Sequence, residues 1–217
     1  MMIELADPAS VKRHLALSST PTLIPWRLES ADALLIVDVQ RDFLPGGAMT
    51  ISGSELILPR LNACMAKFVS RGLPVFASRD WHPQNHRSFV SQGGPWPPHC
   101  IQGSPGAQWA DGLWLPENLV AVSKGQEADA LGSSAFDATD LTQRLRRAGV
   151  HRLFMGGLAT DTCILHTARD ALAQGWEVVV LGDAVAPLDM RIGDGLRALQ
   201  VIQREGGEVA EVAQVLV

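Results

Sequence analysis

The chain has 217 residues, 47% of them hydrophobic, which is enough to bury a substantial core and fits one α/β domain better than two. Its net charge of −5 and the lack of a basic block argue against nucleic acid as a partner. No apolar run is long enough to cross a bilayer, no secretory signal is visible and the three cysteines lack a disulfide-like spacing, so we expect a cytoplasmic protein with reduced thiols and no membrane partner.

The predicted elements alternate between strand and helix. Residues 1–30 have weak periodicity and are predicted to be an N-terminal extension, and residues 31–217 are predicted to form a single domain. The expected strands are residues 33–37, 73–78, 119–122, 152–155, 176–181 and a last one within 208–217. The expected helices are residues 55–70, 139–148, 164–174 and 189–205. This alternation predicts an α/β fold with a doubly wound, mostly parallel six-stranded sheet and helices on both faces.

A long irregular segment separates the second and third expected strands. It runs from about residue 79 to residue 119 and is rich in glycine, proline, tryptophan and histidine. Loops of this length inside a compact domain are usually functional. We therefore expect this segment to contribute to a site.

Reactive side chains follow the ends of four expected strands. Asp38 follows the first strand, Asp80 and His82 the second, Lys124 the third, and Cys163 the glycine turn after the fourth. Taken singly, each residue has a plain structural explanation, such as a loop anchor or a solvated surface charge. Because the carboxyl ends of parallel strands share one edge of the sheet, together they predict one shared site.

Cys163 is the candidate nucleophile. It lies at the start of an expected helix, where unpaired N–H groups and the helix dipole stabilise a thiolate and an adjacent oxyanion. The alternative is a small buried residue that packs the helix onto the sheet. Asp38 can take the thiol proton and later return it to a leaving group, and a nearby Lys124 cation would hold Asp38 ionised and lower the pKa of the thiol. Together they make a workable hydrolytic triad.

The second candidate cluster comprises Asp80, His82, His86 and His99. An aspartate and a histidine two residues apart, with a more distant histidine, are ligands that Zn²⁺, Mn²⁺ and Fe²⁺ accept. The alternative is that these histidines pack the long loop beside its tryptophans. The spacing favours one divalent metal ion with open positions for water or substrate.

Five short motifs occur in one order along residues 33–217. They are Asp38-Val39-Gln40-Arg41-Asp42-Phe43, Ser78-Arg79-Asp80-Trp81-His82-Pro83-Gln84-Asn85-His86, Trp96-Pro97-Pro98-His99-Cys100, Lys124-Gly125 and Gly157-Leu158-Ala159-Thr160-Asp161-Thr162-Cys163. With these motifs the chain resembles the isochorismatase-like cysteine hydrolases, and within them the nicotinamidases (pyrazinamidases). The Asp-Trp-His and Trp-Pro-Pro-His-Cys motifs separate nicotinamidases from relatives without a metal.

The resemblance implies an activity. It implies that Cys163 attacks the carboxamide carbon of nicotinamide, that Asp38 moves the thiol proton to departing ammonia, and that Lys124 assists. The oxyanion would be held by the backbone N–H groups of Ala159 and Cys163, in a turn whose Leu158–Ala159 peptide bond is expected to be cis. Water would then hydrolyse the thioester to nicotinate, a step of NAD salvage, and pyrazinamide is expected to be a second substrate.

The resemblance also assigns the metal ligands and the pocket walls. Asp80, His82 and His99 are the implied ligands, and His86 ranks below them because it does not always touch the metal in relatives. The ion would meet the pyridine nitrogen or position the ring. Phe43 and Trp96 match aromatic residues that wall the ring, and flat aromatic surfaces suit a pyridine.

The sequence departs from the family pattern at one wall. Relatives often have Asp-Ser-Tyr-Ser-Ala-Phe after the lysine, whereas this chain has Gly132-Ser133-Ser134-Ala135-Phe136 and no tyrosine at all, so we expect the substrate range to differ. Relatives range from monomers to tetramers, which leaves a homo-oligomer open.

Three alternatives remain at this point. The first is an amidase for another small carboxamide or carbamoyl compound. The second is an isochorismatase-type vinyl-ether hydrolase, which needs neither the Cys163 nucleophile nor the metal motif. The third is a non-catalytic nucleotide- or metal-binding module, but no phosphate-binding glycine loop follows Asp38.

Overall fold

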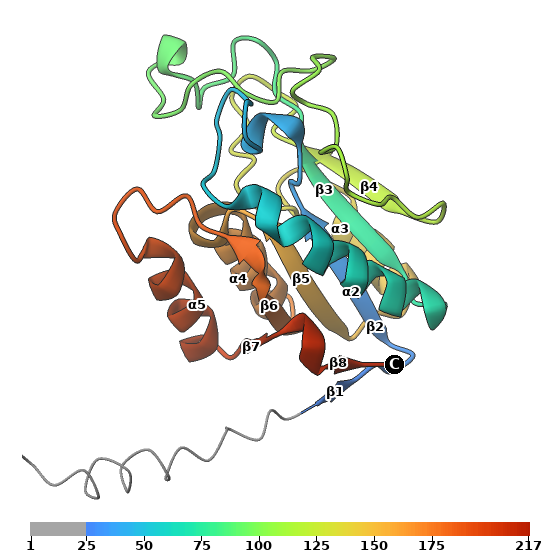
Figure 1. Cartoon of the computed structure of the whole chain (residues 1–217). Helices are drawn as coiled ribbons and strands as arrows, with labels where there is room; N and C mark the ends of the chain where they lie inside the picture. The colour runs from blue at the N-terminus through green and yellow to red at the C-terminus, as the bar shows by residue number, and fades with distance from the viewer. Residues whose placement is uncertain (1–24) are drawn as a thin grey trace, which may run out of the picture.

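A parallel sheet of six strands forms the centre of the computed structural model, which describes residues 25–217 (Figure 1). The strands are β2 (Asp32–Val37), β3 (Val75–Asp80), β4 (Val120–Lys124), β5 (Arg152–Leu158), β6 (Glu177–Ala186) and β7 (Glu208–Ala210). Their order in the sheet is β4-β3-β2-β5-β6-β7, and each neighbouring pair is parallel. The predicted six-stranded, doubly wound sheet is confirmed.

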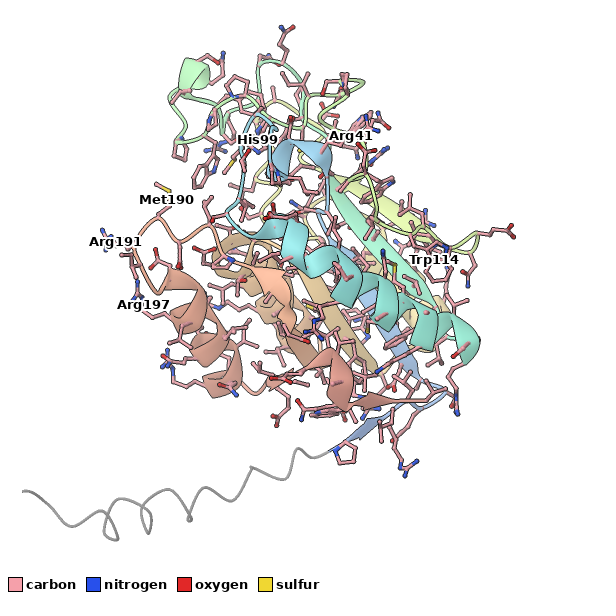
Figure 2. The ribbon with its side chains drawn as sticks, in the orientation of Figure 1. Arg41, His99, Trp114, Met190, Arg191 and Arg197 are labelled. Atoms are coloured by element: carbon pink, nitrogen blue, oxygen red, sulfur yellow. The ribbon has the colours of Figure 1, made fainter. Side chains whose placement is uncertain are left out.

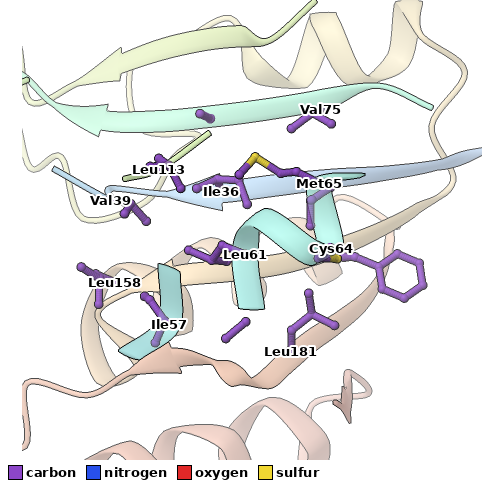
Figure 3. Packing of buried hydrophobic residues seen from close by; sticks show 14 of the residues in the cluster. Ile36, Val39, Ile57, Leu61, Cys64, Met65, Val75, Leu113, Leu158 and Leu181 are labelled. Atoms are coloured by element: carbon purple, nitrogen blue, oxygen red, sulfur yellow. The ribbon is translucent and has the colours of Figure 1, made fainter. Parts of the chain in front are cut away.

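Helices cover both faces of the sheet, as expected. They are α2 (Leu58–Ser70), α3 (Leu141–Arg147), α4 (Leu165–Ala173) and α5 (Asp194–Arg204). On β2, Leu34 and Ile36 pack in the core under α2, where Figure 3 shows Ile36 near Leu61. Leu35 and Val37 point to the other core, which α3, α4 and α5 cover. Because both faces are buried, the strand is apolar at consecutive positions, and each such side chain contributes about 1.5–3 kcal/mol.

The strand order reverses between β2 and β5. β3 and β4 lie on one side of this pair, and β6 and β7 lie on the other. In sheets of this kind the connections after the two central strands diverge, which leaves a crevice at their carboxyl ends. Asp38 directly follows β2, and Cys163 follows β5 in a single π-helical turn (Thr160–Ile164). Both residues therefore lie at the crevice.

The long segment between β3 and β4 lies beyond the carboxyl ends of the strands, as the green loops at the top of Figure 1. It has little regular structure besides a 3₁₀ turn (Val90–Gln92) and isolated bridges such as that between His82 and Ile101. Gln40 fastens it to the sheet, because its Nε2 atom donates hydrogen bonds to the carbonyls of Asp80 (2.7 Å) and Ala107 (3.0 Å). The segment is thus held against the crevice.

Some predicted boundaries are wrong. The helix predicted from residue 189 begins at Asp194, because Asp189 (φ 51°) and Gly193 (φ 88°) have left-handed backbone conformations. The helix predicted from residue 55 begins at Leu58, after a 3₁₀ turn (Ser54–Ile57). Left-handed residues other than glycine give almost no sequence signal, so the first of these shifts was not predictable.

The end of the predicted N-terminal extension packs on the domain. Residues 1–24 lie outside the described part of the chain. β1 (Trp26–Arg27) pairs with β8 (Val215–Leu216) in a separate two-stranded parallel sheet, and Trp26 packs edge-on against Phe154, with 6.2 Å between ring centroids. Within residues 25–217, no helix has the length and apolar character that a bilayer crossing requires.

Arg152, at the start of β5, forms hydrogen bonds to both β1 and β2. Its guanidinium donates two hydrogen bonds to the Asp32 carboxylate (2.9 and 2.7 Å) and one to the Arg27 carbonyl (2.9 Å), and Asp32 is only 2% exposed. We expect Arg152→Leu to lower the free energy of unfolding by about 3 kcal/mol, because it leaves a buried carboxylate unpaired. Urea denaturation measures the change. Arg144→Leu, which breaks an exposed pair, is the control, and equal effects of the two substitutions would contradict the assignment.

Candidate active site

The side chains of Asp38, Lys124 and Cys163 meet at the crevice. The Lys124 Nζ atom lies 2.8 Å from Asp38 Oδ2 and 3.5 Å from Cys163 Sγ. One oxygen each of Asp38 and Asp80 lies within 4.8 Å of that sulfur and of each other. Asp38 and Lys124 are each 1% exposed, whereas Cys163 is partly exposed. The structure thus brings together the strand ends that the sequence placed at one edge.

Ser78 on β3 holds Asp38 in place. The Ser78 hydroxyl donates a hydrogen bond to Asp38 Oδ1 (2.8 Å), and the Asp38 N–H donates to the Ser78 carbonyl (3.0 Å). These bonds leave the second carboxylate oxygen directed at Lys124. Sequence reasoning missed this residue, and the only signal for it is a hydroxyl at the end of an apolar strand.

Lys124 is a buried cation with its hydrogen bonds satisfied. Its ammonium donates to Asp80 Oδ1 (2.5 Å) and to the Gly132 carbonyl (2.7 Å), besides its ion pair with Asp38. Burial alone would lower the pKa of Lys124, but the two carboxylates outweigh burial and raise that pKa well above its ordinary value. Lys124 therefore stays charged between the two acids.

Burial, rather than the lysine charge, dominates the pKa of the thiol. Burial raises the pKa of Cys163 above its ordinary value, the nearby Lys124 opposes this, and a hydrogen bond to Asp38 raises it further. Burial likewise raises the pKa of the Asp38 carboxyl, which Lys124 partly offsets. The predicted effect of Lys124 is confirmed in direction, because the lysine charge lowers the pKa of Cys163, but burial outweighs this effect. The arrangement is a thiol next to a carboxylate that can accept its proton as the sulfur attacks.

The turn that presents Cys163 has an unusual backbone conformation and packs closely against the end of β2. The Leu158–Ala159 peptide bond is cis, as expected, and the sulfur belongs to a π-helical turn that precedes α4 instead of to the first α-helical turn. Gly157 has φ 126°, and a Cβ there would collide with the backbone of Val37. The oxyanion-binding role of the Ala159 and Cys163 N–H groups stays a prediction.

Asp80, His82 and His99 converge as a set of side chains that could hold a metal ion. Their ligand atoms all lie within 4.8 Å of one another, with the Nε2 atoms of His82 and His99 at 3.5 and 4.0 Å from the Asp80 carboxylate. Burial opposes ionisation of Asp80, but Lys124 and the two histidines outweigh it and lower the pKa of that carboxyl.

Backbone carbonyls set the tautomers of both histidines. His82 Nδ1 lies 3.0 Å from the Gly125 carbonyl and His99 Nδ1 lies 2.7 Å from the Pro97 carbonyl, so each Nδ1 carries the hydrogen and each Nε2 lone pair is free. One aspartate and two such imidazoles fit Zn²⁺, Fe²⁺ or Mn²⁺. Gly125 is required here, because a Cβ at this position would collide with the His82 ring.

His86 lies outside this set of ligands. Its ring stacks on that of His82, with 4.0 Å between centroids, and its Nδ1 atom lies 2.7 Å from the Ser88 hydroxyl. Burial lowers the pKa of His86 to about 4. The geometry therefore favours a role for His86 in holding the His82 ring in place by stacking on it.

We expect one divalent ion to stabilise the protein through Asp80, His82 and His99. Adding Zn²⁺ to chelator-treated protein is expected to raise the melting temperature. At a free Zn²⁺ concentration a hundredfold above Kd, binding adds about 2.7 kcal/mol to the free energy of unfolding. Differential scanning fluorimetry measures the shift. His82→Ala and His99→Ala are expected to lose it and His86→Ala to keep most of it. A shift that survives His99→Ala but not His86→Ala would place the ion elsewhere.

A cavity of about 320 Å³ opens above these groups. Phe43 and Trp96, the two predicted wall residues, both line it, and Cys163 lies in the same lining, with Asp38 and Lys124 buried behind. Figure 2 shows His99 under the loops in the upper part of the molecule. Sequence reasoning gave no cavity role to six further lining residues. Thr162 lies within the motif that ends at Cys163, and the others lie outside the five motifs: Met49, Ser88, Leu131, His166 and Leu188.

Comparison with known proteins places the chain in a family. The family model described as "Isochorismatase domain" matches residues 32–214. A nicotinamidase of Escherichia coli is 33% identical over 202 residues, which are 83% of this chain and 95% of that protein.

Two solved structures are similar throughout. The pyrazinamidase of Pyrococcus horikoshii in complex with zinc has a TM-score of 0.80 and 43% identity, covering 83% of this chain and 99% of that one. PnC1 of L. infantum in complex with nicotinate has a TM-score of 0.83 and 36% identity, covering 89% and 99%. Fold, matched residues and sequence identity agree, and the chain therefore belongs to the isochorismatase family.

Proposed function

We propose that this protein is a nicotinamidase, a cysteine amidohydrolase that converts nicotinamide to nicotinate and ammonia and also acts on pyrazinamide. The observation that carries the proposal is the joint placement of a thiol, a carboxylate and an ammonium at one cavity, next to three convergent metal ligands. Relatives described as nicotinamidases and pyrazinamidases support the choice of substrate. The reaction is a step of NAD salvage, which we place in the cytoplasm.

In the first half of the reaction the thiol is acylated. The Cys163 proton moves to Asp38 as the sulfur attacks the carboxamide carbon, and the carbonyl oxygen becomes an oxyanion facing the N–H groups of Ala159 and Cys163. Donors of this kind are worth about 10²–10³ in rate. Asp38 then gives the proton to the departing nitrogen, ammonia leaves, and a thioester remains on Cys163.

In the second half water hydrolyses the thioester. Asp38 takes a proton from the water as the water oxygen attacks the carbonyl carbon, and it returns a proton to the sulfur when the carbon–sulfur bond breaks. Nicotinate leaves and the thiol is restored. Lys124 keeps its positive charge throughout and offsets the negative charge that moves between Asp38 and the sulfur.

Asp80, His82 and His99 would hold one divalent metal ion, which we propose is zinc, or else iron or manganese. When bound, the ion supplies a Lewis acid for the pyridine nitrogen or a water beside it. Phe43 and Trp96 would then hold the ring by its faces. We propose that residues 31–217 form the hydrolase domain and that residues 1–30 supply none of its catalytic groups.

Product analysis with the purified, metal-loaded protein tests the proposal. We expect nicotinate and ammonia in equal amounts from nicotinamide, measured by chromatography and a coupled ammonia assay. A panel of other small carboxamides and carbamoyl compounds serves as the comparison. Faster ammonia release from a carbamoyl compound, with nicotinamide untouched, would favour the alternative amidase on the same three residues.

A further inference from the structure

We infer that the cavity has a second recognition surface, formed by Ser133, Thr162 and His166, which selects carboxamides that carry a neutral polar group on the ring. We call these three residues the polar wall. The inference rests on the proposed function, since it concerns the substrate of the same site. It adds a substrate class, the hydroxyl- or amino-substituted pyridine and pyrazine carboxamides.

The polar wall adjoins the nucleophile. His166 follows Cys163 by three residues and Thr162 by four, so its side chain lies on the same side of the helix as each of them. Ser133 comes from the loop between β4 and α3. All three residues line the cavity together with Cys163.

The hydrogen-bonding groups of the polar wall are unused. Within residues 25–217 the structure has no hydrogen bond or ion pair for the side chains of Ser133, Thr162 and His166, although backbone carbonyls hold His82 and His99 at the metal end. Each hydroxyl can donate and accept. Partial desolvation lowers the pKa of the His166 ring, although the residue is exposed overall, and this favours the neutral ring with one donor and one acceptor.

The size of the cavity leaves room for such a substituent. About 320 Å³ lies within the range of pockets that hold drug-sized ligands, and nicotinamide, with one ring and one amide group, is smaller than these. With the ring between Phe43 and Trp96 at the metal end, a substituent can extend to the polar wall. The polar wall offers two hydroxyls and an imidazole and carries no fixed charge, so a neutral substituent that can donate or accept a hydrogen bond fits it.

Matched substrate pairs test this inference. Nicotinamides with an amino or hydroxyl group at ring position 5 or 6 are compared with their methyl counterparts of similar size, and kcat/KM is measured for each. We expect wild type to prefer the polar member by about threefold to tenfold, the effect of one hydrogen bond of roughly 0.5–1.5 kcal/mol. The double variant Ser133→Ala, His166→Leu is expected to bring the ratio to about one. His151→Leu, on an exposed histidine outside the cavity, is expected to leave it unchanged.

A binding measurement separates this inference from the proposed function. The Kd values of the same pairs are measured by tryptophan fluorescence in the Cys163→Ala protein, and Ser133→Ala alone serves if the double variant does not fold. If the Cys163→Ala protein binds the polar member of each pair more tightly but the wild-type protein hydrolyses no amide, the polar wall is supported and the proposed function is overturned. Hydrolysis of nicotinamide with equal rates for methyl and polar partners would overturn the polar wall alone. A preference that survives the double variant would also overturn it.

Discussion

Replacing Cys163 with alanine is expected to lower kcat for nicotinamide by at least about 10⁴-fold, as expected for the loss of a covalent nucleophile. The sulfur lies 3.5 Å from Lys124 and lines the cavity, and the mechanism has no other group that can form the acyl intermediate. Without the thiol, water would have to attack the amide carbon directly. Steady-state kinetics with product analysis measures the loss.

The control is Cys64→Ala, since Cys64 is a fully buried core residue on α2, away from the cavity. Its loss is expected to lower stability but to leave kcat within about twofold, because the substitution changes packing and not the site. Nicotinate binding by the Cys163→Ala protein, measured by calorimetry, is expected to persist. A Cys163→Ala protein with more than a few per cent of the wild-type kcat would remove the residue from its assigned role.

Replacing Asp38 with asparagine is expected to lower kcat by about 10²–10⁴-fold with a small change in KM, as is typical for the loss of a general acid and base. Asparagine has the same shape but cannot carry the proton between thiol and leaving group. Lys124 keeps its bonds to Asp80 and to the Gly132 carbonyl, so we expect the variant to fold. The melting temperature checks this, and stopped assays measure the rate.

Ser78→Ala gives a graded comparison for Asp38→Asn. It removes one hydrogen bond to the carboxylate without removing the carboxylate, so a loss of about tenfold or less is expected. If Asp38→Asn lost no more activity than Ser78→Ala, Asp38 would only position other groups and another residue would transfer the proton.

The convergence of the site was predictable because of a general property of parallel sheets. Apolar runs that end in Asp38, Asp80 or Lys124 identify strand ends, and strand ends of parallel sheets meet at one edge. The strand order, with its reversal between β2 and β5, then places Asp38 beside the turn of Cys163. The convergence of these residues could therefore be predicted without knowing any side-chain conformation.

The supporting contacts were not predictable from sequence. The carbonyls of Gly125, Pro97 and Gly132 orient His82, His99 and Lys124, yet every residue has a carbonyl, so no sequence pattern marks these three. Spacing alone could not separate His86 from His99, because the path of a long loop decides which ring reaches Asp80. The raised pKa of Cys163 likewise follows from burial, which is a property of the folded molecule.

A structure of the metal-loaded protein with nicotinaldehyde tests the central claim most directly. This aldehyde has the ring of nicotinamide but no leaving group, so attack by the thiol would stop at a stable adduct. We predict continuous density between Cys163 Sγ and the aldehyde carbon, with the oxygen facing the N–H groups of Ala159 and Cys163. An unmodified Cys163 with the aldehyde bound elsewhere would contradict the account.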